Sequence, residues 1–399
     1  YLCIGEGERT ILDFAKAISA GQDPRPIPNL CYQADGQIKR NPLYPLIENL
    51  DTLPFIEHLP KNGFLQETSG RISLMNEQLA RKYGRYQHKF YDISTSRGCP
   101  FSCTYCCSDF ISRLMGSKRI RKRSLENIIL ELENAIRDYP FIQTINFHDD
   151  NFLSRPIEFF KDFRDAYLKR VNKPFMFDCI PLFVTREKIA LLKEAGLIWI
   201  RMGLQSGSDR TLKEIYKRKS LSKHFLEAAE ILKEFGIAAY CDVILDNPFE
   251  TKQDHLDTIR VLIKAPRPYH LQLYSLTPFY GTELYEKIRK ECPEKLTDPN
   301  RDYREYEKND LNTLARMSPY IPRKIMYQLV EIYERDPGGK LFKNLLFIAR
   351  MLNLLFFEQV SQFRLIKLSQ AGSVRKMLKI IPIYQKRWFE RYTKHFQAG

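Results

Sequence analysis

The chain has 399 residues, of which 44% are hydrophobic and 13% are aromatic. This composition supports a large core and excludes a disordered chain, and the length allows about two or three domains. A formal net charge of +15 is compatible with a nucleic acid, an anionic membrane surface or an acidic substrate as partner, and equally with a solvated basic surface.

The first residues have the pattern of a strand, a glycine turn and a helix. Residues 1–4 are strand-like, Gly5-Glu6-Gly7-Glu8 follows, and Thr10–Ser19 has helical spacing. Because the chain opens on a strand and not on methionine, we expect an N-terminal truncation. Residues 21–85 are rich in Pro, Asn, Asp and Gly, so we expect them to connect this segment to the next domain.

Strands and amphipathic helices alternate from residue 86 to residue 290. Six strands are predicted at Phe90–Ser96, Phe141–Phe147, Pro174–Ile180, Leu197–Leu204, Ile237–Leu245 and Tyr269–Leu276. Helices are predicted between them at 124–139, 154–171, 185–196, 222–235 and 251–264. Ser154 is expected to cap the second helix, and Thr251 with Asp254 resembles a capping box.

This alternation predicts an α/β fold with a parallel sheet. Six units are too few for a closed eight-stranded barrel, so we expect a curved, open three-quarter barrel. Ligands of such sheets bind at the carboxyl ends of the strands. The sequence therefore predicts a site at that edge.

The residues from 291 to 399 are helical, basic and aromatic in pattern. Their most apolar stretch, Leu341–Val360, contains Lys343, Arg350 and Glu358, which are too polar for a spanning helix. We expect a C-terminal helical domain packed on the barrel. The alternative is peripheral membrane contact through 341–357 and 375–394.

Nine cysteines include one close group, Cys99-x3-Cys103-x2-Cys106, with Tyr105 before the last thiol. Three thiolates on one loop can hold three corners of a four-iron cluster, which takes four thiolates when fully ligated. One iron is then open to a small molecule, as in an open zinc site. Structural zinc or unligated thiols are the alternatives, although the chain has no second CxxC pair. A thiolate-held cluster also indicates a reducing, cytoplasmic location.

This CxxxCxxC run resembles the signature of radical S-adenosylmethionine (SAM) enzymes. The resemblance implies that Cys99, Cys103 and Cys106 hold a [4Fe-4S] cluster whose open iron chelates SAM. It also implies an electron donor such as flavodoxin or ferredoxin. One electron from the cluster would cleave SAM and release a 5′-deoxyadenosyl radical.

Other segments resemble the SAM-binding elements of that family. The residues that the resemblance implies are Tyr105, Asp149, Asp150, Gln205, Ser206 and Ile244. A carboxylate at Asp149 or Asp150 can bind the SAM ammonium, with a helix cap or turn as the alternative. Gly203–Gly207 resembles the family's Gly-Ile-Glu-Ser-Gly segment with Gln for Glu, with a plain glycine turn as the alternative. No catalytic residue is assigned.

The Asp-Asp pair, the N-terminal pattern and the string Leu50-Asp51-x-Leu53-Pro54 resemble the cobalamin-dependent branch of the family. The resemblance implies four segments: 1–20 as a remnant of the cobalamin-binding domain, 21–85 as linker, 86–290 as radical SAM core, and 291–399 as helical domain. Cobalamin binding is expected to need upstream residues, because the family's cobalt-ligating histidine lies there.

In that branch, enzymes methylate or cyclise natural products, tetrapyrroles or lipids, so we expect a small-molecule or lipid-like substrate. Two other hypotheses stay open. One is an RNA-modifying enzyme similar to methylthiotransferases, but their upstream cysteine trio is absent here, and we therefore do not expect a nucleic-acid partner. The other is a zinc-stabilised binding protein without enzymatic activity.

Overall fold

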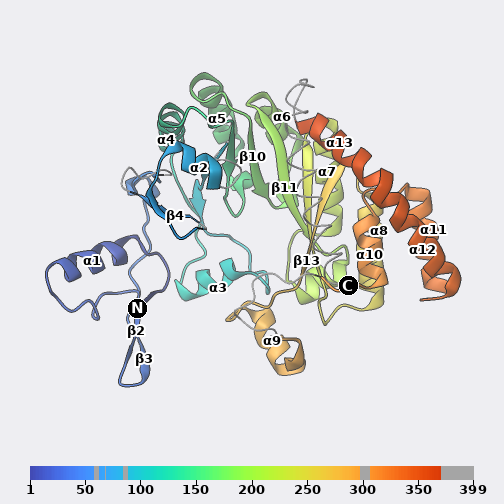
Figure 1. The fold of residues 1–399 in the computed structure, drawn as a ribbon, viewed down its shortest axis with the longest axis horizontal. Helices are drawn as coiled ribbons and strands as arrows, with labels where there is room; N and C mark the ends of the chain where they lie inside the picture. Colours follow the sequence, from blue (N-terminus) through green and yellow to red (C-terminus); the bar gives the residue numbers. More distant parts are fainter. Residues whose placement is uncertain (58–62, 68, 84–88, 297–305, 370–399) are drawn as a thin grey trace.

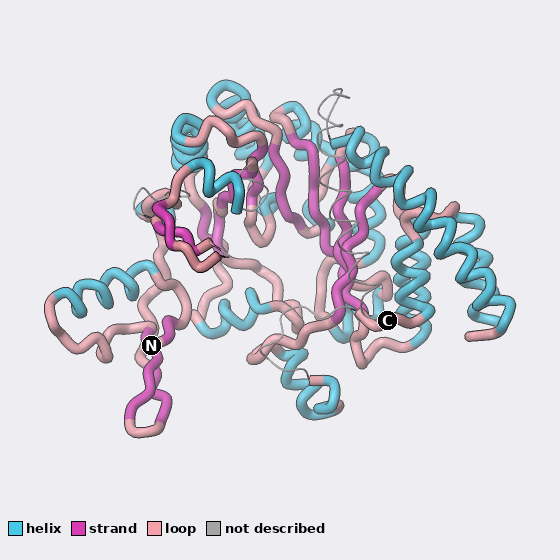
Figure 2. The backbone as a smooth tube through the Cα atoms, viewed as in Figure 1, coloured by secondary structure: helices cyan, strands magenta, loops and turns pink. Residues whose placement is uncertain are grey.

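The structure is a computed structural model that describes residues 1–57, 63–67, 69–83, 89–296 and 306–369. Its centre is a six-stranded sheet in the order β13-β12-β11-β10-β9-β6, in which every pair of neighbours is parallel. The strands are β6 (Phe90–Ile93), β9 (Thr144–Phe147), β10 (Phe175–Cys179), β11 (Leu197–Gln205), β12 (Ala238–Leu245) and β13 (Tyr269–Ser275). The sheet is open and curved (Figures 1 and 2), which confirms the predicted fold class.

Five helices cover the convex face of the sheet (Figure 1). They are α4 (Leu125–Asp138), α5 (Ile157–Arg170), α6 (Arg186–Glu194), α7 (Ser222–Glu234) and α8 (Lys252–Lys264). Fully buried aromatic rings fill the space beneath them, with Phe147, Phe163 and Phe175 in mutual contact. The predicted capping box is confirmed: the Thr251 backbone N–H donates to Asp254, and the Asp254 N–H donates back to the Thr251 hydroxyl.

The prediction that Ser154 caps α5 is wrong. Ser154 ends a short 3-10 turn, η3 (Phe152–Ser154), and α5 begins after Pro156 without a side-chain cap. The reason is local, because the residue before a proline is driven out of the helical region. Arg155 is accordingly extended, with ψ of 153°, and separates the turn from the helix.

The N-terminal region has more structure than a plain connection. β1 (Leu2–Cys3) and α1 (Glu8–Ser19) match the pattern, but β1 pairs antiparallel with a hairpin formed by β2 (Leu30–Ala34) and β3 (Gln37–Arg40). Farther along lie η1 (Leu50–Thr52), β4 (Phe64–Gln66), β5 (Ile72–Leu74) and α2 (Glu77–Tyr83). The hairpin turn is Asp35-Gly36, and φ is positive at both residues. This dipeptide is a hairpin signal, but it lies in a segment whose composition is typical of a connection.

The C-terminal region is mainly helical, as predicted, over the residues that the structure describes, 283–296 and 306–369. Residues 375–394, the second segment of the alternative membrane contact, lie outside the described residues. After α9 (Glu283–Glu291) and η6 (Pro293–Lys295) it contains α10 (Asp310–Met317), α11 (Arg323–Arg335), α12 (Lys340–Leu352), η7 (Asn353–Phe357) and α13 (Glu358–Ser369). Helices α10 and α11 pack on α8, whereas α13 contacts β11, β12 and β13. Within the described ranges, no helix is long and apolar enough to cross a membrane.

Candidate active site

The three-cysteine loop lies between β7 (Ser96–Arg97) and α3 (Cys107–Leu114), just beyond the carboxyl end of β6. Pairing of β7 with β8 (Arg121–Lys122) fixes the start of the loop. Gly98 has φ of 101°, and a Cβ there would lie 2.9 Å from the Arg119 carbonyl oxygen, so only glycine fits.

Thr104 fastens the middle of the loop to the segment that follows β11. Its backbone N–H donates to the Tyr216 carbonyl over 3.1 Å, and its hydroxyl donates to the Ile215 carbonyl over 2.7 Å. Ile215 ends the π-helical turn η5 (Thr211–Ile215). These two hydrogen bonds connect the segment after β6 to the segment after β11 at the cysteine loop.

The three thiols are unpaired and largely shielded. Cys103 is buried, and Cys99 and Cys106 are half-buried. Burial raises the pKa of Cys99 to about 11 and also raises the pKa of Cys103. Without metal these two thiols are therefore protonated, and coordination would displace their protons. Among the residues that the structure describes, no group of three His, Cys, Asp or Glu side chains is arranged to hold a single metal ion.

A buried guanidinium lies against this loop. Arg218 is 8% exposed and donates to the Tyr105 hydroxyl over 2.9 Å and to the Gly203 carbonyl over 2.8 Å. Burial works against its charge, but the pKa of Arg218 is raised by the phenol of Tyr105 and by the neighbouring Cys103 thiol. The sequence pattern does not indicate a role for Arg218, because this residue lies in a Lys-Arg-Lys run that is typical of solvated surface.

The two predicted carboxylates have different environments. Asp149 is buried and accepts hydrogen bonds from the backbone N–H groups of Thr95 and Ser96 and from the Thr95 hydroxyl. Asp150 is exposed and accepts a hydrogen bond from the Ser108 hydroxyl over 3.3 Å. Partial desolvation raises the pKa of Asp150, and its charge acts on Cys99. Asp149 thus holds the start of the loop, and Asp150 lies near enough for its charge to act on Cys99.

Gln205 reaches the site and Ser206 supports it. Gln205 has φ of 67°, and a Cβ on Gly203 would lie 2.3 Å from its amide nitrogen, so this glycine leaves room for the Gln205 side chain beside Arg218. Ser206 is fully buried and donates to Glu250 over 2.8 Å. Burial raises the pKa of the Glu250 carboxyl.

Ile244 and Tyr105 contact one apolar cluster beneath the loop. The cluster consists of Leu212, Ile215, Tyr216, Leu276, Leu284 and Ile288. Two residues after Ile244, the carboxylate of Asp246 is occupied by partners within the protein. It accepts hydrogen bonds from the Glu307 backbone N–H and from the Asn312 side-chain amide. That carboxylate therefore anchors the start of the C-terminal helices.

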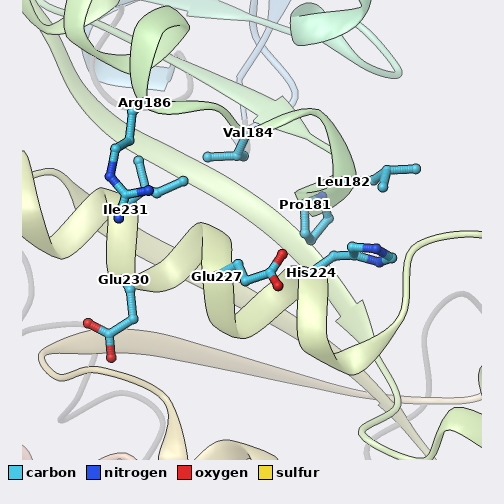
Figure 3. Close-up of a pocket in the computed structure, with 8 residues that line it drawn as sticks. All are labelled: Pro181, Leu182, Val184, Arg186, His224, Glu227, Glu230 and Ile231. Carbon is cyan, nitrogen blue, oxygen red and sulfur yellow. The ribbon is translucent and has the colours of Figure 1, made fainter.

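A surface hollow of about 320 Å³ opens between α7 and η4 (Pro181–Phe183), the turn that follows β10. Figure 3 shows Glu227 and Glu230 on α7 and Arg186 across from them. None of the residues assigned above lines this hollow. The chemistry that the sequence predicts therefore belongs to the cysteine loop.

Fold and site together define an open parallel α/β barrel with a three-thiol loop at the carboxyl ends of its strands. The Radical SAM superfamily model matches residues 93–262. The chain belongs to the radical SAM superfamily of enzymes, and the predicted family is confirmed.

The chain is also similar to a curated protein and shares its fold with solved structures. An uncharacterized methyltransferase of Pyrococcus horikoshii is 30% identical over 293 residues, which cover 71% of this chain and 56% of the relative. The cobalamin-dependent SAM radical enzyme OxsB, with aqua-cobalamin bound, has a TM-score of 0.59 at 15% identity and covers 96% of this chain and 64% of its own. The radical SAM methyltransferase TsrM of Kitasatospora setae has a TM-score of 0.53 at 18% identity, with 73% and 54% covered. The chain thus spans little more than half the length of the curated relative.

Proposed function

We propose that this chain is the radical SAM core of a cobalamin-dependent enzyme that methylates or cyclises a small organic substrate. The observation that carries the proposal is the loop of Cys99, Cys103 and Cys106 at the carboxyl ends of the parallel strands. These thiolates would ligate a [4Fe-4S] cluster and leave one iron open. When bound, the cluster supplies the electron that cleaves SAM reductively to methionine and a 5′-deoxyadenosyl radical.

The environment of Arg218 supports an anionic group at the loop. Its guanidinium donates to the Tyr105 hydroxyl and to the Gly203 carbonyl, and its Nε atom is buried without a hydrogen-bond partner among the described residues. A buried cation that faces only neutral groups is costly. Cluster-bound thiolate at Cys103 would supply the missing negative charge, so the residues present fit the cluster.

For SAM we assign roles to the residues around the loop. Asp150 would bind the ammonium group, since it is the exposed carboxylate of the pair and its charge acts on Cys99. Gln205 would hydrogen-bond a hydroxyl or carboxylate of SAM, and Ile244 and Tyr105 would form the apolar floor. Asp149 and Ser206 would position these groups without touching SAM.

The cobalamin dependence rests on the resemblance of the chain to OxsB and TsrM. In this proposal residues 1–20 end a cobalamin-binding unit, 21–85 connect it, 86–290 form the radical SAM core and 291–399 form the helical domain. A one-electron donor such as flavodoxin or ferredoxin would reduce the cluster. Cobalamin would carry the methyl group in the methylating case.

The test is anaerobic reconstitution with iron and sulfide, followed by SAM and dithionite, with detection of 5′-deoxyadenosine by mass spectrometry. We expect 5′-deoxyadenosine from the wild-type chain and from Cys107→Ala, whose thiol is next to the loop but outside the trio. We expect none above background from Cys103→Ala. Equal product from Cys103→Ala and the wild-type chain, or no product from reconstituted wild-type chain, would contradict the proposal.

A further inference from the structure

Alternate residues of the parallel strands point away from the helices and form a polar concave face. On β11, Ile200 and Met202 are buried under the helices, so Trp199 and Arg201 face the opposite side. The same alternation places further polar groups on that side. They are Asp92, Asn146, His148, Asp178, Asp242 and Tyr274.

Hydrogen bonds join this face into two groups. On one side the His148 imidazole lies 2.9 Å from Asp92 and 3.9 Å from Asp178. On the other side Arg201 donates to Asp242 over 2.6 Å and to the Tyr274 hydroxyl over 2.5 Å. Asp178 is the register partner of Arg201, so its carboxylate stands between the two groups.

The polar side chains of this face are partly exposed to solvent. The side chains of Asp92, Asp178 and Arg201 are 40%, 37% and 39% exposed, whereas the interior of a closed barrel is filled by side chains. Helix α13 covers the end of the face that is farther from the cysteine loop, where the Gln362 amide lies 3.4 Å from the His270 imidazole. At that end the ring of Tyr240 contacts the rings of Trp199 and His270. The charged layer lies between that end and the cysteine loop.

The layer is within reach of the proposed radical. Gly203, whose carbonyl accepts from Arg218 at the cysteine loop, is two residues beyond Arg201 on β11, a rise of about 7 Å. Asp242 is the register partner of Gly203. A molecule held at Asp178 and Asp242 would therefore present a neighbouring carbon to the SAM site.

The charges of the face select its ligand. Asp92, Asp178 and Asp242 outnumber Arg201 whether or not His148 is protonated, so the face is negative. Two buried atoms, Asp242 Oδ1 and Trp199 Nε1, have no hydrogen-bond partner in the described structure. An apolar lipid would desolvate the half-exposed side chains of Asp178 and Arg201 without offering them a hydrogen bond, and a carboxylate-rich tetrapyrrole would meet like charge.

Resting on the proposed function, we propose that the substrate is an organic cation, an amine, amidine or guanidine, whose charged group binds between Asp178 and Asp242. The aromatic rings below would pack against its hydrocarbon part. A substrate of this class differs from the lipids and tetrapyrroles expected from the sequence.

The test uses the intrinsic fluorescence of Trp199. The chain has two tryptophans, and Trp388→Phe leaves Trp199 as the sole reporter. The reconstituted variant is titrated anaerobically with benzamidine, benzamide and benzoate, which share a shape and differ in charge. We expect saturable binding of benzamidine about tenfold tighter than that of benzamide, equal to about 1.4 kcal/mol, and no binding of benzoate. Asp178→Asn should weaken benzamidine about tenfold, whereas Glu230→Gln on the outer face of α7 should leave it unchanged.

Equal affinities for the three probes, preference for benzoate, or an Asp178→Asn variant that binds benzamidine like its parent would overturn the inference. The fluorescence titration measures binding without turnover, so the inferred substrate class and the proposed function can be contradicted independently. If 5′-deoxyadenosine forms but benzamidine does not bind, the substrate class is wrong and the radical chemistry stands. If benzamidine binds and no 5′-deoxyadenosine forms, the radical chemistry fails instead.

Discussion

The guanidinium of Arg218 donates to the hydroxyl of Tyr105 over 2.9 Å, and this contact bridges 113 positions of sequence. It joins the cysteine loop that follows β6 to the turn that follows β11, and it brings a positive charge against Cys103. Arg218 therefore both holds the loop in position and places a positive charge beside its buried thiol.

Replacing Arg218 with methionine should make the cluster harder to reduce, because a buried cation beside a thiolate stabilises the reduced, more negative state. We expect the reduction potential to fall by about 60 mV, a tenfold change for one electron. A redox titration followed by electron paramagnetic resonance measures it. Lys217→Met, which removes an adjacent exposed cation paired with Glu283, is the control and should change the potential little. An unchanged potential in Arg218→Met would show that Arg218 acts only on packing.

Asp149→Asn and Asp150→Asn should separate loop support from SAM binding. Asp149→Asn replaces the oxygen that accepts from the Thr95 hydroxyl with an amide donor and removes the negative charge that the Thr95 and Ser96 backbone N–H groups face. We expect a cost of about 1–3 kcal/mol of unfolding free energy. Asp150→Asn should leave the melting temperature unchanged and raise the Kd of SAM about tenfold. Denaturant unfolding and equilibrium dialysis of the reconstituted protein measure the two effects. The assignment of roles fails if the two variants exchange phenotypes.

Gly207→Ala should destabilise the fold through steric overlap. A Cβ at this position would lie 2.4 Å from the Thr258 Cα and 3.0 Å from the Asp257 carbonyl oxygen on α8, and backbone atoms cannot yield easily. We expect a loss of about 1–3 kcal/mol in denaturant unfolding. Gly7→Ala is the control, since its Cβ would meet only the Cys3 sulfur, at 3.6 Å. Equal stability of the two variants would mean that β11 and α8 are not packed this closely.

Glu6 should make the stability of the protein depend on acid pH. Although burial opposes ionisation, hydrogen bonds from Arg121, Ile47 and Arg97 lower the pKa of Glu6 from 4.5 to about 2. A carboxylate with a lowered folded-state pKa stabilises the protein above its unfolded pKa, and that stability is lost as the pH falls through the folded value. We expect Glu6→Gln to lower the melting temperature at pH 7 and to flatten its decline from about pH 5 to about pH 2. A decline as steep as in the wild-type chain would exclude this role.

Local signals were sufficient for most of the barrel. Period-two and helical spacing placed the six strands and five covering helices, and the Thr251 box marked the start of α8 correctly. They failed where a neighbouring residue decided the geometry, as Pro156 did for Ser154. Composition also misled: the Pro- and Asn-rich segment after residue 20 concealed the hairpin at Asp35-Gly36.

Within the candidate site, only the cysteine trio and the strand-end positions of its neighbours could be predicted. Arg218 could not, because its contact with Tyr105 depends on how two strand ends meet in space. The same holds for Arg201 and Asp242, which pair across 41 positions because of the register of β11 and β12. Asp149 and Asp150 are adjacent in sequence, yet only their burial distinguishes the one that supports the loop.

The most direct test of the account is iron and acid-labile sulfide analysis of the anaerobically reconstituted chain. The account predicts about four irons and four sulfides in the wild-type chain and in Cys107→Ala, and less than about one iron when Cys99, Cys103 and Cys106 are all alanine. A triple variant that keeps its full iron content, or a wild-type chain that binds only zinc, would contradict it.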